Sequence, residues 1–163
     1  MKSRIRLLGV GAALATAFAT APIGASAGDA KRVVIAERNT IVAFDPATGA
    51  GTQAGTFHAA GAISDTGTAS SHFIVTPIGG DRAILEGDHV LSSAGGTLVV
   101  RSRVTLSPYP APRVIAQGTW KIVDATGTYA GVEGHGKSLA VGDFTTATAT
   151  IMRDGVVALE PEH

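Results

Sequence analysis

The feature that most constrains this chain is a series of eight segments rich in valine, isoleucine, threonine and alanine. Turn-forming residues separate these segments at near-regular intervals after residue 28. No apolar stripe with helical spacing runs longer than about two turns in this region. Short, regularly spaced segments of this composition predict strands, and eight of them predict a β-sandwich or a β-barrel. The predicted strands are residues 31–44, 53–61, 66–76, 82–92, 96–106, 113–123, 132–140 and 143–153.

Two of these segments alternate between apolar and polar residues, which predicts strands with one buried face. The inward sets are Leu98, Val100, Ser102, Val104 and Leu106 in one segment and Val114, Ala116, Gly118, Trp120 and Ile122 in the next. A sheet with one dry face has to close on itself or pack against a second sheet. Closure also removes the free strand edges that promote aggregation. We therefore predict an all-β fold, a closed eight-stranded antiparallel β-barrel.

The first 27 residues have the three parts of a secretory signal peptide. A basic start (Lys2, Arg4, Arg6) precedes an apolar run, and the segment ends in Ala25-Ser26-Ala27. The run is dominated by alanine, threonine and glycine, so cleavage is favoured over a membrane anchor. We therefore predict a secreted protein, extracellular or at the cell surface, with one domain over residues 28–163 and no membrane span after cleavage.

Removal of this segment changes the net charge of the chain. The full sequence has 13 basic and 13 acidic residues, and loss of the three basic residues leaves a net charge of −3. Proteins that bind nucleic acid usually have a basic excess, so no nucleic-acid partner is expected. The chain also has no cysteine, so the predicted domain has to be stabilised by a packed core instead of disulfides.

The stretch from Gly118 to Gly136, with its Ala125-Thr126-Gly127 turn and Tyr129, resembles the late strand, turn and strand of the allene oxide cyclase and dirigent families. In this stretch Gly127 can supply a positive φ, and Tyr129 can fold over the barrel end as a plug. The resemblance covers roughly residues 53–155. It implies an eight-stranded barrel with a central cavity, often a homo-oligomer, which in plants acts on an oxylipin epoxide or on phenoxy-radical coupling. The cysteine near the cyclase pocket has no counterpart here.

A second family is suggested by Gly118-Thr119-Trp120, which is similar to the Gly-x-Trp of lipocalins and avidin-like barrels. In lipocalins that motif lies on the first strand, whereas here it lies on about the sixth. We therefore rank this alternative below the first resemblance.

Few residues are candidates for catalysis or metal binding. The five histidines are scattered without a paired spacing, so neither a metal nor another cofactor is expected. On the segment 82–92, Glu86 and Asp88 share one face and His89 the other. One interpretation is a solvated outer face. The alternative is that Glu86 or His89 projects into a pocket as a proton donor or anion stabiliser during a cyclisation.

The aromatic residues are the candidates for ligand binding. Phe57 and Phe73 lie among small neighbours and could line an apolar cavity or simply pack in the core. Trp120 could stack on a ligand or fill the barrel floor, and Tyr129 is assigned to the same set.

These observations predict a cofactor-free barrel that binds a small, mostly apolar molecule in its lumen. An enzyme of this kind would template a stereoselective cyclisation, because the cavity would hold a reactive, flexible substrate in shape and exclude water. The alternative is a ligand-binding or surface-interaction barrel with no catalytic activity.

Overall fold

The structure is a computed structural model that describes residues 29–108 and 112–159. Within these ranges it has eight strands and one short 3-10 helix, η1, between the sixth and seventh strands. The predicted signal peptide, residues 1–27, lies outside the described residues. The elements are β1 (Lys31–Phe44), β2 (Ala50–Gly61), β3 (Asp65–Gly79), β4 (Arg82–Ser92), β5 (Thr97–Pro108), β6 (Arg113–Ala125), η1 (Gly127–Tyr129), β7 (Val132–Asp143) and β8 (Thr148–Leu159).

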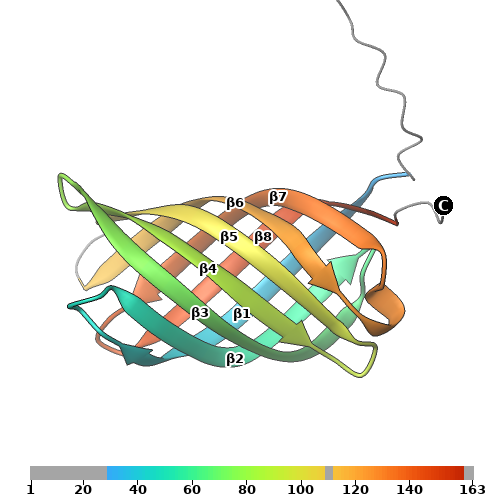
Figure 1. The fold of residues 1–163 in the computed structure, drawn as a ribbon, viewed down its shortest axis with the longest axis horizontal. Helices are drawn as coiled ribbons and strands as arrows, with labels where there is room; N and C mark the ends of the chain where they lie inside the picture. Colours follow the sequence, from blue (N-terminus) through green and yellow to red (C-terminus); the bar gives the residue numbers. More distant parts are fainter. Residues whose placement is uncertain (1–28, 109–111, 160–163) are drawn as a thin grey trace, which may run out of the picture.

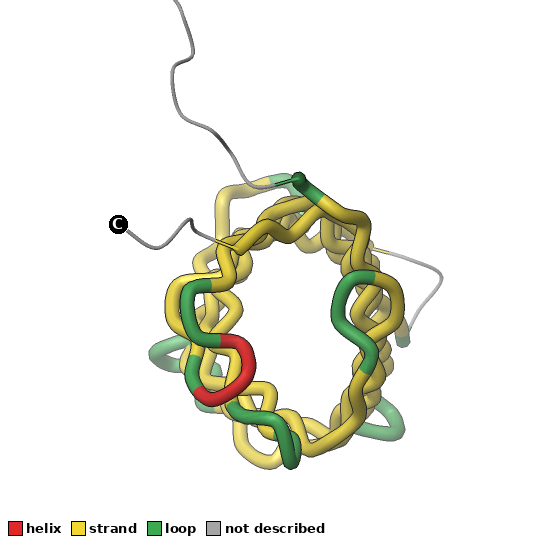
Figure 2. The backbone as a smooth tube through the Cα atoms, turned by 90° about the vertical axis from the view of Figure 1, so that its right-hand side faces the viewer, coloured by secondary structure: helices red, strands yellow, loops and turns green. Residues whose placement is uncertain are grey.

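Each strand pairs antiparallel with the next, and β8 pairs antiparallel with β1, so the sheet closes into a barrel. Figure 2 shows the resulting ring of strands from one end. The predicted fold, a closed eight-stranded antiparallel β-barrel, is therefore confirmed. Within the described ranges, no helix has the length and the apolar character needed to cross a membrane.

The prediction was wrong for the boundary between the last two strands. β7 continues to Asp143, and β8 begins only at Thr148 and runs to Leu159. The Asp143 carboxylate accepts hydrogen bonds from the backbone N–H groups of Thr145 and Thr146, which fixes a turn. Ala147 ends this turn with a φ of 53°. The sequence Thr145-Thr146-Ala147 looks like strand by composition, but the aspartate before it makes it a turn.

The interior of the barrel is divided into two halves along its axis. The half nearest η1 is filled by a hydrophobic cluster that includes Ile35, Leu91, Leu98 and Trp120. We call this half the packed end. The opposite half lies beneath the turns that connect β1 to β2, β3 to β4 and β7 to β8, and we call its edge the rim. On β5 the buried residues are Leu98, Val100, Ser102 and Val104, all members of the predicted inward set, and its fifth member, Leu106, is half-buried.

Tyr129 covers the packed end, as predicted. It is 7% exposed, belongs to the hydrophobic cluster, and donates its hydroxyl hydrogen to Asp65. This bond, with one from Ser93 at 2.7 Å, lowers the pKa of the Asp65 carboxyl. Gly127 starts η1 with a φ of 65°, and a Cβ there would lie 2.3 Å from the carbonyl oxygen of Gly95. A glycine is therefore needed at this position both for its backbone conformation and for space.

Candidate functional site

A cavity of about 210 Å³ occupies the half of the barrel beneath the rim. We call it the lumen cavity. Its walls are mainly apolar and include Ile41, Phe73, Val75, Leu85, Val104 and Leu106. Phe44 and Phe144, which are 46% and 59% exposed, line it where it reaches the rim, so the cavity opens to solvent there. Its polar lining residues are Gln53, His89, Ser102, Ser138 and Arg153.

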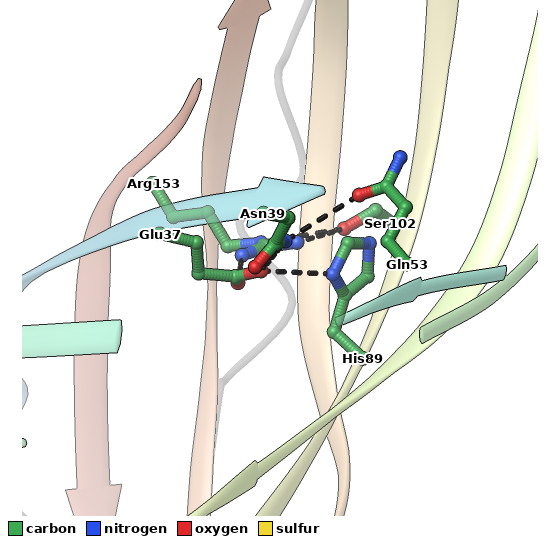
Figure 3. A network of polar contacts seen from close by, with 6 residues as sticks. All are labelled: Glu37, Asn39, Gln53, His89, Ser102 and Arg153. Atoms are coloured by element: carbon green, nitrogen blue, oxygen red, sulfur yellow. Dashed lines mark hydrogen bonds and ion pairs between the residues drawn. The ribbon is translucent and has the colours of Figure 1, made fainter. Parts of the chain in front are cut away.

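The floor of the lumen cavity is a buried polar network centred on the Glu37 carboxylate (Figure 3). Glu37 is fully buried and forms an ion pair with Arg153, which is 1% exposed. Asn39 donates an N–H to Glu37 Oε2 at 2.9 Å, and His89 Nδ1 lies 3.0 Å from the same oxygen. All three neighbours can donate, which is the environment of an ionised carboxylate.

Burial determines the protonation of the two basic groups in this network. It lowers the pKa of His89 to about 4, so the imidazole is neutral at neutral pH. It lowers the pKa of Arg153 to about 9, so the guanidinium keeps its charge there. Because Glu37 is an acceptor, the proton of the neutral ring is on Nδ1 and the lone pair is on Nε2. The floor thus contains one buried anion, one buried cation and a neutral imidazole.

Two further side chains connect the network to the cavity. Arg153 donates from Nε and Nη2 to Ser102 Oγ at 3.4 and 3.2 Å. The hydroxyl of Ser102 therefore has its own hydrogen left to donate. Gln53 Oε1 accepts an N–H from Asn39 at 3.4 Å, which leaves the Gln53 amide group as a donor. Gln53, Ser102 and His89 line the cavity, so these functions are available to a bound molecule.

The predicted site residues lie in three different places: the lumen cavity, the packed end and the outer surface. His89 faces the interior at 3% exposure and lines the lumen cavity. Glu86 lies on the outer surface, where Arg103 donates to its carboxylate at 2.6 Å, and it does not point into the lumen. The strand alternation explains this difference, since adjacent odd and even positions face opposite sides.

Among the predicted aromatic residues, Phe73 lines the lumen cavity and stacks with Phe44, with ring centroids 6.3 Å apart. Phe57, Trp120 and Tyr129 belong to the hydrophobic cluster of the packed end and do not line the cavity. The positions of Phe57 and Trp120 match the core-packing interpretation that the sequence left open, and Tyr129 lies at the packed end. A molecule in the cavity would meet Phe73 alone of these four.

A wider depression on the outer surface is lined by apolar residues such as Phe44 and Ile74 together with charged side chains, including Glu86 and Asp88. These charges already neutralise one another, because Arg101 pairs with Asp88 at 2.7 Å and Arg103 with Glu86 at 2.6 Å. Exposed pairs of this kind are screened by water, and this depression lacks most of the buried polar groups that the lumen cavity has. We therefore take the lumen cavity as the candidate site.

Glu37, Asn39 and Arg153 were not predicted as site residues, although the sequence contains a signal for them. β1 has the inward set Val33, Ile35, Glu37, Asn39 and Ile41, in which two polar residues stand among apolar ones. Arg153 follows the inward residues Ala149 and Ile151 on β8 in the same way. Charged residues are rarely buried without a partner, so two opposite charges at inward positions predict an internal ion pair.

Comparison of the chain with protein-family models, with curated proteins and with solved structures finds no significant match. The candidate site is therefore interpreted from its geometry. Within the described residues no group of three metal-ligating side chains comes together.

Proposed function

We propose that this protein binds a small, mostly apolar molecule in the lumen cavity, with the polar end of the molecule on the floor and its apolar part against the walls. The observation that carries this proposal is a 210 Å³ cavity with apolar walls, open at the rim, above buried polar groups with unused hydrogen-bonding capacity. Binding sites combine apolar walls with a few placed polar groups in this way.

The volume limits the size of the enclosed part of the ligand. A protein cavity of roughly 150 Å³ accommodates benzene, which has six non-hydrogen atoms, so 210 Å³ encloses about eight. A longer molecule would extend past Phe44 and Phe144 at the rim. The floor has one anion and one cation in contact, so its net charge is near zero. It therefore favours an uncharged polar group, such as a carbonyl or hydroxyl, over an ion.

The enzymatic form of the proposal is templated, stereoselective cyclisation of such a molecule by a secreted, cofactor-free barrel of the allene oxide cyclase and dirigent type. The resemblance of residues 118–136 to those families and the signal-peptide pattern support it. The packed end closes one side of the cavity, which favours one orientation of a flexible substrate. The alternative is a barrel that binds the same molecule without changing it.

A titration with 2-naphthol, an eleven-atom fluorescent molecule with one hydroxyl, tests the binding proposal. Saturable binding is expected in the unmodified protein. Ala116 is 5% exposed and lines the cavity, so Ala116→Phe should fill it and abolish binding. Gln117 is the next residue on β6 and is exposed, so Gln117→Phe adds the same ring outside and should bind normally. Equal binding by both variants, or none by the unmodified protein, would contradict the proposal.

A further inference from the structure

The polar floor of the lumen cavity contains the parts of a proton-transfer site as well as a binding site. Glu37 and His89 form a buried carboxylate–imidazole pair with 3.0 Å between Oε2 and Nδ1. In such a pair the carboxylate holds the ring and its tautomer, and it stabilises the imidazolium that forms when Nε2 takes a proton. His89 lines the cavity, so its ring borders the space where a ligand would lie.

A second pair of residues supplies the complementary electrophile. Ser102 lies on β5 within two residues of Val100, the direct partner of His89 on β4, so His89 and Ser102 are diagonal neighbours on the inner face. Ser102 accepts two N–H groups from the buried Arg153 cation, which polarises its own O–H. A hydroxyl that accepts hydrogen bonds from a cation is a stronger donor, so it stabilises negative charge on a ligand oxygen in a buried site.

We propose that this floor catalyses proton transfer at a carbon next to a carbonyl group, with His89 as the base and Ser102, supported by Arg153, as the hydrogen-bond donor to the carbonyl oxygen. The inference rests on the proposed function, because the ketone or aldehyde has to bind in the lumen cavity. It names the ligand class as a small enolisable carbonyl compound.

The step balances without any other reactant. Nε2 of His89 takes a proton from the α carbon, and the electrons of that C–H bond form a C=C bond. The electrons of the carbonyl π bond move to the oxygen, which becomes an enolate held by Ser102. The imidazolium then returns a proton to the same carbon, or to a more distant carbon of an unsaturated ketone, which moves the double bond. In D₂O the ring N–H exchanges with solvent that enters at the open rim, so the returned proton is a deuteron. Glu37 is a positioning residue in this scheme.

The packing of the barrel supports a chemical role for these groups. The packed end shows that this chain fills a barrel of this diameter with Leu91, Leu98, Trp120 and similar residues. A buried ion pair is commonly no more stabilising than apolar residues of the same volume. The polar layer lies between the packed end and the open cavity, which is where a ligand entering from the rim would stop.

The test is deuterium exchange into the α positions of 2-tetralone, an eleven-atom ketone, followed by proton NMR in D₂O. The protein should accelerate exchange above the rate in an equal concentration of imidazole. His89→Gln should lower the rate by about 10²-fold, the low end of the contribution of a general base, because a pKa of about 4 makes this ring a weak base. Ser102→Ala should lower it by about 10²- to 10³-fold. His72 is an exposed histidine on the adjacent strand, so His72→Gln is the matched control and should keep the full rate.

Glu37→Gln separates positioning from a merely structural role. Titratable or charged groups that face His89 from other strands are Glu37 on β1 and Arg153 on β8, and Asp88 adjoins it on the outer face of β4. Loss of the Glu37 charge should lower the exchange rate and move the acid limb of its pH profile to lower pH. A uniform loss of rate with an unchanged pH profile would contradict the positioning role.

The outcomes distinguish this inference from the proposed function. Binding of 2-tetralone that Ala116→Phe abolishes, without accelerated exchange, would overturn the proton-transfer site and leave the binding function intact. Failure of both 2-tetralone and 2-naphthol to bind would overturn both. Equal exchange rates in His89→Gln and His72→Gln would also overturn the proton-transfer site. Circular dichroism checks that each variant is folded, and Ser102→Ala provides an independent test should His89→Gln not fold.

Discussion

The internal ion pair between Glu37 and Arg153 predicts a particular pattern of stability changes. Arg153→Met replaces the cation by an apolar side chain of similar length and leaves the Glu37 carboxylate fully buried without its partner. Breaking a buried pair on one side costs about 3–5 kcal/mol, because the remaining charge is not compensated. Removing the charge of Glu37 as well, in Glu37→Gln/Arg153→Met, should recover most of this loss.

Urea unfolding followed by Trp120 fluorescence measures these changes, since Trp120 is the single tryptophan and is buried. With a slope of roughly 2 kcal/mol per molar, a loss of about 4 kcal/mol lowers the midpoint by about 2 M. Arg32 and Asp154 provide the control, because they pair at 2.8 Å between the same two strands but on the outer face. Arg32→Met should move the midpoint far less. Similar shifts for Arg153→Met and Arg32→Met, or a double variant less stable than Arg153→Met, would refute the reasoning.

Two further predictions concern His89 and the turn at η1. The pKa of His89 falls from 6.5 to about 4 on folding, so between these pH values the unfolded chain binds a proton that the folded protein excludes, and stability falls as the pH falls. From pH 7 to pH 4 the protein should lose up to about 3 kcal/mol more than His89→Gln in urea unfolding; equal losses would show that the ring is not held neutral. At the turn, Gly131→Ala meets open space at a φ of 77° and should cost about 1 kcal/mol in the same assay. Gly127→Ala also meets the Gly95 carbonyl oxygen at 2.3 Å, so it should cost clearly more, and equal costs would contradict the steric argument.

The fold could be predicted from the sequence because the strand composition, the turn-forming residues and the single buried face all indicate a closed barrel. The alternation in β5 and β6 fixes which residues face inward, and turn-forming residues separate the eight strands. The strand boundaries were predicted least well at the turn after Asp143. There, residues that favour β-structure follow an aspartate whose side chain accepts hydrogen bonds from the backbone. Hydrogen bonds from one side chain to the nearby backbone compete with strand pairing, and the average composition of a segment does not reveal them.

The candidate site was only partly predictable, because it is assembled from distant strands. The alternation of β4 separates His89 from Glu86 and Asp88, but its partner Glu37 lies 52 residues earlier in the chain. Periodicity shows that a residue points inward, and it does not show how far along the barrel axis the residue lies. The position of a residue along the barrel axis depends on the register of every strand pair between β1 and β4. The periodicity within one strand does not give that register. For the same reason Phe57 and Phe73 could not be assigned to the packed end and to the cavity in advance.

The polar layer could serve the fold instead of a ligand, because Glu37 and Arg153 connect the first and last strands and could specify how the barrel closes. The observed contacts argue against register as their main role. β1 and β8 already pair over ten consecutive residues, from Lys31 with Val157 to Thr40 with Thr148. Side chains that fix the pairing of β1 with β8 need to lie only on these two strands. The network instead reaches across the lumen to His89 on β4 and Ser102 on β5, and both of these side chains line the open cavity. A polar layer with that extent and that exposure to the cavity fits a surface that receives a ligand.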